Sequence, residues 1–183
     1  MLNKKQLIEA VSNGLQPEFL YFWGHRQKGH DLGKSCLSQW YPARFELKGE
    51  LYLSAEHFMM AEKAFLFGDE DTRSRILATS SPEEAKALGR RVRGFDSHVW
   101  EARCVDIVVQ GNEAKFSQND ALGQFLIATG NRILVEASPL DLIWGIGLAQ
   151  DNPLAGWPEH WPGLNLLGFA LMLMKVREHL HRT

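Results

Sequence analysis

The stretch Ser54-Ala55-Glu56-His57-Phe58-Met59-Met60-Ala61-Glu62-Lys63 decides the fold, because it predicts a helix that is apolar around most of its circumference. Ser54 is a favourable N-cap residue. The residues that follow are mostly good helix formers and continue to Phe67, just before Gly68. A helix of this kind is expected to be buried at the centre of the molecule.

Two charged residues lie on one stripe of this predicted helix. Glu56 and Lys63 are seven residues apart, almost two full turns, so both project from the same face, with Met60 between them. Inside a protein, a carboxylate and an ammonium must find each other, another partner or a ligand. The alternative is a solvated surface stripe that benefits from the helix dipole, and the pattern alone leaves both interpretations open.

The rest of the chain predicts a mainly α (α+β) fold with a small β component. The 183 residues suit one domain spanning 1–183. Asp120 is the expected N-cap of the helix over 121–128, and residues 24–37 are expected to form a long irregular loop. Further helices are expected over 1–13, 71–78, 81–88, 97–116 and 166–180. Strands are expected over 18–23 and 132–136, and a hairpin over 44–53 is expected to turn at Lys48-Gly49. A loop is expected over 151–163.

Composition excludes several classes of function. Twenty basic and 22 acidic residues give a net charge of −2, so no overall basic field draws the chain to nucleic acid or to a membrane, although a local basic pocket remains open. Two cysteines and seven histidines show no metal-binding spacing. The chain has neither the apolar core of a signal peptide nor an apolar run of membrane-spanning length, which predicts a cytoplasmic protein.

A second candidate carboxylate is Asp141, which ends the segment Ser138-Pro139-Leu140-Asp141. This segment resembles the helix-capping pattern Ser81-Pro82-Glu83-Glu84, so capping explains Asp141 as well as chemistry does. The following residues 143–147 form an apolar wall that contains glycines beside the carboxylate, which favours chemistry. An aromatic wall can hold a flat heterocycle, although each tryptophan alone is more often a core residue; the candidates are Trp40, Trp100 and Trp144.

The basic cluster Arg90, Arg91 and Arg93 lies between Gly89 and Gly94. It is either a phosphate site or, as base rates favour, a solvated helix end. A Ser-His-Asp hydrolase is excluded on motif grounds, since the chain has no nucleophile elbow.

Several motifs together resemble one known family. They run in order along most of the chain: Phe19–Trp23, Ser38-Gln39-Trp40-Tyr41-Pro42, Ser54–Lys63, Ala87–Arg90, Trp100, Lys115–Asn119, Leu126–Gly130, Leu134–Glu136, Ser138–Gly145 and Asn165–Gly168. On these motifs the chain resembles the YbiA-like N-glycosidases of the NADAR (NAD and ADP-ribose associated) family. It departs from them at Gln39-Trp40, where the family usually has Asn-Phe, and in a longer loop over 24–37.

The resemblance implies a mainly α fold and hydrolysis of an N-glycosidic bond between a ribose and a nitrogenous base or amine. The best-known substrates are a ribosylamino-pyrimidine 5-phosphate of early riboflavin synthesis, whose cleavage releases ribose 5-phosphate, and its precursor. Other members remove ADP-ribose from guanine bases. The matching motifs give Glu56, Trp100 and Asp141 as the active-site set, and they imply no metal and no organic cofactor.

The expected roles follow from an oxocarbenium-like transition state. The helix dipole and Lys63 are predicted to keep Glu56 ionised, which suits a base, a nucleophile or a stabiliser of the cation. Asp141 is expected to orient ribose hydroxyls or to protonate the leaving nitrogen. The expected substrate-binding residues are Lys63, Ser38, Trp40, Trp144 and Arg44. Trp100 and Trp144 are expected to stack on the base, and Lys63 with an arginine, Arg44 or Arg90, is expected to meet the phosphate.

Three alternatives remain open from the sequence. The chain could hydrolyse ADP-ribosyl-guanine in modified nucleic acid, which would require an open pocket and salt-sensitive binding. It could be a non-catalytic module that binds ADP-ribose or NAD, although two carboxylates are of little use to a protein that only binds an anion. A purely structural role is the weakest of the three, because the tryptophan-rich elements suggest a pocket.

Overall fold

The computed structural model describes residues 3–26 and 31–181. The expected mainly α class with a small β component is confirmed. The α-helices are α1 (Lys4–Ser12), α2 (Ala55–Leu66), α3 (Glu70–Ala78), α4 (Pro82–Gly89), α5 (Ser97–Ser117), α6 (Asp120–Ala128) and α7 (Leu166–His181). The strands are β1 (Phe19–Phe22), β2 (Phe45–Leu47), β3 (Glu50–Tyr52) and β4 (Ile133–Glu136), and the 3-10 helices are η1 (Lys34–Leu37) and η2 (Pro158–His160).

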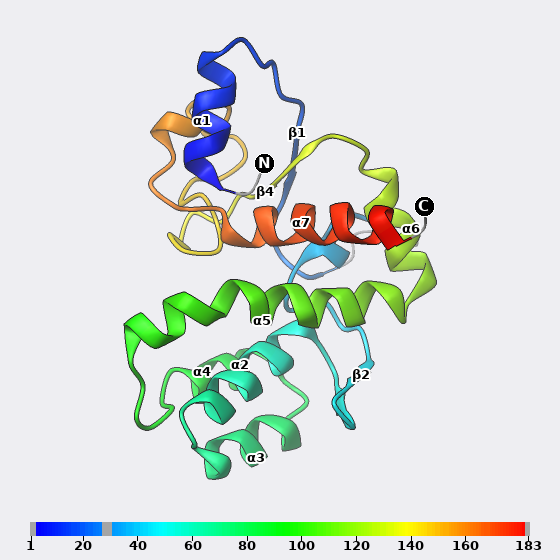
Figure 1. Cartoon of the computed structure of the whole chain (residues 1–183), viewed down its shortest axis with the longest axis vertical. Coiled ribbons are helices and arrows are strands. Elements are labelled where there is room, and N and C mark those ends of the chain that lie inside the picture. The colour runs from blue at the N-terminus through cyan, green and yellow to red at the C-terminus, as the bar shows by residue number, and fades with distance from the viewer. Residues whose placement is uncertain (1–2, 27–30, 182–183) are drawn as a thin grey trace.

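The long helix α5 crosses the middle of the molecule, with α7 on one side and the group α2, α3 and α4 on the other (Figure 1). Helix α2 packs against α3, α4 and α5, and nine of its twelve residues are buried. Ser54 caps it by accepting a hydrogen bond from the His57 N–H. The central buried helix predicted from 54–67 is therefore confirmed.

Glycines allow the neighbouring helices to approach α2 closely. A Cβ atom on Gly111 of α5 would lie 2.5 Å from Cδ1 of Phe58, and one on Gly89 of α4 would lie 2.0 Å from Sδ of Met60. A side chain at either position would force Met60 or Phe58 to shift, so glycine permits the present close packing of both helices.

The strands form two small sheets. Strands β2 and β3 pair antiparallel across the predicted turn at Lys48 and Gly49, whose φ values of 56° and 80° match a two-residue hairpin turn with both residues left-handed. Strands β1 and β4 pair in parallel, with Phe22 opposite Glu136. Helix α7 packs against β4.

Three local predictions were wrong. Asp120 is the first residue of α6 rather than its cap, because the Asn119 side chain donates hydrogen bonds to the carbonyls of Arg44 and Lys115. Within 24–37, η1 is helical, while residues 27–30 lie outside the described residues. The loop over 151–163 likewise contains η2.

Lys115 is a fully buried residue that holds α5 to the chain before β2. Its Nζ donates hydrogen bonds to the carbonyl oxygens of Cys36 at 2.7 Å and Ser38 at 2.8 Å. Burial lowers the pKa of Lys115 to about 7, and a neutral amine still has the two N–H groups that these bonds need.

We predict that Lys115→Met lowers the free energy of unfolding by about 2–4 kcal/mol, because two buried carbonyls lose their donor. The unfolded state holds this proton up to the ordinary pKa of 10.5, whereas the folded state releases it near 7. The stability advantage of the wild type over the variant should therefore grow as pH rises from about 6 to about 9. Urea unfolding at both pH values measures it, with Lys5→Met on the exposed face of α1 as control; an advantage that shrinks with pH would contradict the assignment.

Candidate active site

Glu56 lies in the first turn of α2 and is 4% exposed. Its Oε1 is buried without a hydrogen-bond partner, while the carboxyl group accepts a hydrogen bond from the Trp40 side chain. Burial raises the pKa of Glu56 to about 7. Lys86 opposes the rise, Asp141 adds to it, and the Trp40 hydrogen bond and Arg90 also oppose it. A carboxyl group with this pKa can either hold or accept a proton at neutral pH.

The predicted ionisation of Glu56 was therefore wrong in direction. The sequence predicted that the helix dipole and Lys63 would keep it charged, but the loss of hydration inside the core outweighs nearby positive charge. Lys63 does lie on the same face as expected, and the charge of Glu56 favours its protonated form.

Glu136 is a half-buried residue at the carboxyl end of β4 that supplies a second carboxyl group, and sequence reasoning missed it. Its Oε2 is buried without a hydrogen-bond partner. Burial, reinforced by the charges of Asp141 and Glu56 and opposed by Lys86, raises its pKa to about 8. The sequence feature that could have identified Glu136 is its position as a charged residue at the end of an otherwise apolar strand, directly before the Asp141 turn.

Asp141 differs from these two carboxyl groups because both of its oxygens have partners. Its Oδ1 accepts hydrogen bonds from the backbone N–H of Ile143 at 2.9 Å and of Trp144 at 2.8 Å. Its Oδ2 lies 3.9 Å from Nζ of Lys86, a residue of α4 that the sequence did not single out. The residues after Asp141 form turns rather than a helix, so Asp141 stabilises a loop.

Together, Glu56, Glu136, Asp141 and Lys86 form what we call the carboxyl cluster. They come from α2, β4, the loop after β4, and α4, and each carboxyl group influences the other two or the shared lysine. Three acidic groups around one close ammonium group favour retention of a proton, which is the arrangement that general acid–base chemistry uses.

Asn165 fixes the loop that carries two of these carboxyl groups. It is fully buried with φ of 55°, and it accepts a hydrogen bond from the Glu136 N–H and donates to the Leu134 carbonyl. Its backbone N–H donates to the carbonyl of Gly145. A Cβ atom on Gly145 would lie 2.9 Å from the Glu136 carbonyl oxygen and 3.1 Å from that of Asp141, so the loop closes tightly between them.

The segment of Ser38, Gln39 and Trp40 forms another wall. Ser38 is buried and accepts a hydrogen bond from the Trp40 N–H. Gln39 accepts one from Asn112 of α5 through its side chain, and its carbonyl accepts one from the Glu56 N–H. Ser38 and Gln39 thus position Trp40, whose ring centroid lies 5.8 Å from Nζ of Lys86.

Trp100 is half-buried and belongs to a separate aromatic group with Lys63. The Nζ of Lys63 lies 4.2 Å from the ring centroid of Phe95 and 5.4 Å from that of Trp100. Burial and the nearby Arg90 lower the pKa of Lys63, while Glu56 raises it. Trp100 is therefore linked to the carboxyl cluster through Lys63, and Trp144 joins it through its backbone bond to Asp141.

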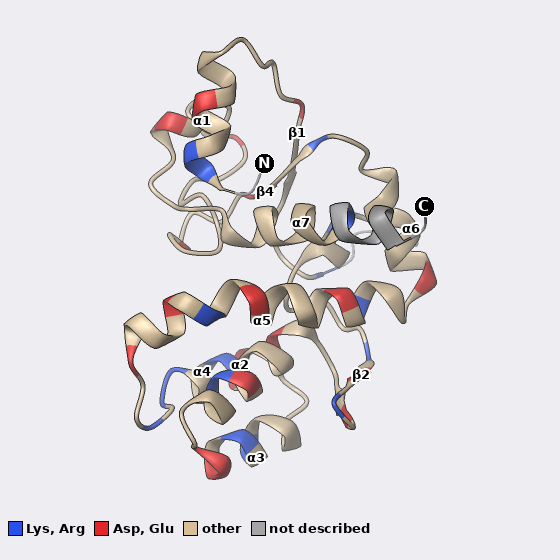
Figure 2. Cartoon of the chain, viewed as in Figure 1, with Lys and Arg blue, Asp and Glu red and all other residues tan. Residues whose placement is uncertain are grey.

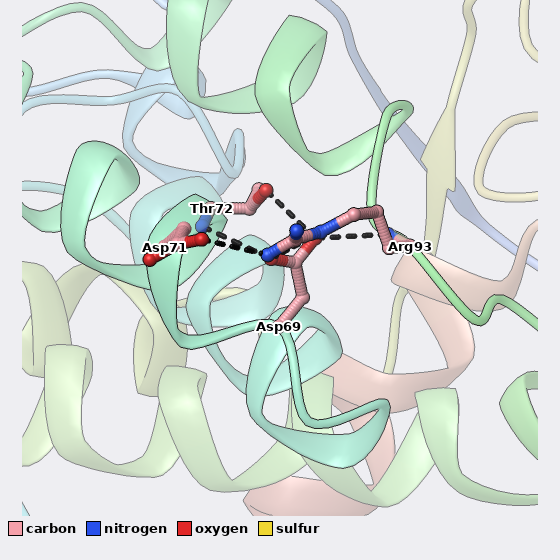
Figure 3. A network of polar contacts seen from close by, with 4 residues as sticks. All are labelled: Asp69, Asp71, Thr72 and Arg93. Atoms are coloured by element: carbon pink, nitrogen blue, oxygen red, sulfur yellow. Dashed lines mark hydrogen bonds and ion pairs between the residues drawn. The ribbon is translucent and has the colours of Figure 1, made fainter.

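Two of the arginines between Gly89 and Gly94, Arg90 and Arg93, interact with different groups. Arg93 donates hydrogen bonds from its side chain to Asp69 at 2.7 Å and to Asp71 at 2.9 Å, and Asp69 also accepts from Thr72 (Figure 3). These bonds hold the pKa of Asp69 well below its usual range. Arg93 is thus structural, whereas Arg90 acts electrostatically on Glu56 and Lys63.

A cavity of about 320 Å³ lies against Trp40, the tryptophan that contacts Glu56. Arg44 is exposed and lines it, as do Ser54 and His57 from the start of α2 and Pro82 from the start of α4. The sequence-predicted residues Trp40 and Arg44 therefore line one cavity, and Trp40 links that cavity to Glu56.

The described residues contain no group of three His, Cys, Asp or Glu side chains placed to hold a metal ion. Across that same part of the chain, the helices are too short or too polar to cross a membrane. Acidic and basic residues are interspersed along the elements (Figure 2), in keeping with the net charge of −2.

Comparison with known proteins now identifies the family. The model of the NADAR domain matches residues 21–181, a span that includes every member of the carboxyl cluster. The chain belongs to the NADAR family. The resemblance stated from the sequence motifs is thereby confirmed.

Two relatives in the NADAR family are named N-glycosidases. One, from Acanthamoeba polyphaga mimivirus, is 45% identical over 86% of this chain and 95% of its own length. The other, from Nostoc punctiforme, is 30% identical over 79% of this chain and 85% of its own.

A riboflavin biosynthesis protein of Vibrio vulnificus is 31% identical over 95% of this chain, which spans 42% of that protein. The solved structure of E. coli YbiA matches with a TM-score of 0.73 at 25% identity, covering 92% of this chain and 89% of YbiA. The YbiA-like fold is therefore confirmed for this NADAR chain.

We predict that Glu136→Gln raises the free energy of unfolding at about pH 9 by about 1–3 kcal/mol and leaves it nearly unchanged at about pH 5. Glu136 in the folded state holds its proton up to a pKa of about 8, above the ordinary 4.5, so stability falls as pH rises through this interval. The amide carries no charge and avoids that loss. Chemical unfolding at both pH values tests this, with the exposed Glu9→Gln as control; equal differences at the two pH values would contradict it.

Proposed function

We propose that this chain hydrolyses the N-glycosidic bond of a ribosylamino-pyrimidine 5-phosphate and releases ribose 5-phosphate. The class of enzyme, a hydrolase acting on N-glycosyl compounds, is supported by relatives named N-glycosidases, and the pyrimidine substrate by relatives named riboflavin biosynthesis proteins. The observation that carries the proposal is the pair of buried carboxyl groups, Glu56 and Glu136, beside a tryptophan wall.

The chemistry needs negative charge beside the anomeric carbon and a group that takes a proton from water. Glu56 fits this role because its Oε1 is unpartnered and its pKa of about 7 makes it a proton acceptor near neutral pH. Asp141, held by Lys86 and two backbone N–H groups, is assigned to orient ribose hydroxyls.

The two ends of the substrate are assigned to two separate groups of residues. The phosphate is assigned to the cavity beside Trp40, where Arg44 can make charge-assisted hydrogen bonds. The pyrimidine is assigned to the aromatic side that includes Trp100, with Lys63 and Arg90 near it and Trp144 across the loop.

The function is tested by incubating the purified protein with the ribosylamino-pyrimidine 5-phosphate and, separately, with ADP-ribosylated guanosine. We expect ribose 5-phosphate from the first and no ADP-ribose from the second. Glu56→Gln should lower kcat for the first by about 10²- to 10⁴-fold, with Glu9→Gln as control. Release of ADP-ribose alone would favour action on modified nucleic acid, and binding of ADP-ribose without hydrolysis of either compound would favour a sensor.

We predict that Arg44→Ala raises KM for the 5-phosphate substrate about tenfold or more, because a charged hydrogen-bond donor to phosphate is lost. The same change should leave KM for the dephosphorylated riboside unaltered, since that compound carries no phosphate. Steady-state kinetics on both compounds measures the difference, with Arg103→Ala on the exposed surface of α5 as control. An equal rise in KM for both compounds would show that Arg44 does not bind the phosphate.

A further inference from the structure

The three carboxyl groups of the cluster differ in their hydrogen-bond partners. Asp141 accepts two backbone N–H bonds and faces the Lys86 ammonium, and all three partners stabilise the ionised form. The Oε2 of Glu136 has no partner among the described residues, and neither has the Oε1 of Glu56. A carboxyl oxygen buried without donors is stabilised by carrying a proton itself.

Cleavage of an N-glycosidic bond from an amine requires a proton donor as well as a proton acceptor, since an unprotonated amine is a poor leaving group. The geometry points to Glu136, rather than Asp141, as the residue that protonates the leaving nitrogen. This assignment rests on the proposed function.

The surroundings of Glu136 favour its role as the donor. The charged groups that act on it are Glu56 from α2, Lys86 from α4 and Asp141 from the following loop, and the residue that holds it from the start of α7, Asn165, is uncharged. Burial, with two acidic neighbours against one basic neighbour, favours a proton on Glu136, whereas the hydrogen bond from the Trp40 side chain favours the ionised form of Glu56. The two groups therefore divide into an acid and a base.

The proposed step balances within the cluster. The proton of Glu136 passes to the nitrogen as the bond between C1′ and nitrogen breaks, and the bonding electron pair leaves with the nitrogen. The oxygen of a water molecule bonds to C1′, and a proton of that water passes to the ionised Glu56. Glu56 and Glu136 together hold one proton before and after the reaction, and after it this proton is on Glu56. The proton returns to Glu136 because the pKa of Glu136, about 8, is higher than that of Glu56, about 7.

The assignment is tested with two substrates that differ in the leaving group. One is the ribosylamino-pyrimidine 5-phosphate, whose amine needs protonation. The other is a nitrophenyl riboside 5-phosphate, whose leaving group departs as a stable anion. Each is assayed with the wild type, Glu136→Gln, Glu56→Gln, Asp141→Asn and the control Glu9→Gln.

We expect Glu136→Gln to lower kcat for the amine substrate by about 10²- to 10⁴-fold with little change in KM, and to retain activity on the nitrophenyl substrate. The kcat of the wild type on the amine substrate should fall at alkaline pH, because the acid loses its proton there. The kcat of Glu136→Gln on the nitrophenyl substrate should show no such fall. Glu56→Gln should lose activity on both substrates, and Asp141→Asn should affect both equally.

Three results would overturn the assignment. Equal loss on both substrates would place Glu136 in a structural role, and selective loss of the amine activity in Asp141→Asn would return the proton to Asp141. Full activity of Glu136→Gln on both would exclude it from the reaction. If the wild type cleaves neither substrate, the proposed function fails as well, which separates that outcome from the other three.

Discussion

The arrangement of this protein depends on three carboxyl groups that share one close ammonium group inside the fold. Glu56 and Glu136 lose solvation energy when they ionise there, and Lys86 compensates only part of that loss. The fold satisfies Asp141 with hydrogen bonds and leaves one oxygen of each glutamate without a partner. The unpartnered carboxyl oxygens lower the stability of the folded state at the site where proton transfer is needed.

Buried polar side chains hold the segments that carry the three carboxyl groups of the cluster. Asn165 holds β4 and the Asp141 loop, and Lys115 holds the segment before Trp40 against α5. Asn112 of α5 holds Gln39, whose carbonyl in turn receives the Glu56 N–H. Asn165 and Lys115 bind backbone groups and Asn112 binds the Gln39 side chain in the described structure, so these residues set the geometry of the site without being part of its chemistry.

The sequence predicted the features that depend on neighbouring residues and missed those that depend on tertiary packing. Helix α2, its Ser54 cap and the Lys48-Gly49 turn follow from local patterns. Glu136 was missed because its burial requires β1, α7 and the Asp141 loop to meet. The pKa direction of Glu56 was wrong because the helix dipole is a local effect, whereas desolvation depends on every element packed around α2. One partner of Asn119, the Arg44 carbonyl, is likewise distant in sequence, so the start of α6 was misplaced.

The most direct test of the account is a titration of the glutamate carboxyl groups by carbon-13 NMR on the ligand-free protein, with Glu56 and Glu136 assigned from their Gln variants. It needs no substrate, so it examines the cluster independently of the reaction. We expect two carboxyl groups that remain protonated well above the ordinary value of 4.5, with midpoints near 7 for Glu56 and near 8 for Glu136. Midpoints near 4.5 for both would show that the cluster is solvated and ionised at neutral pH, and would contradict the account.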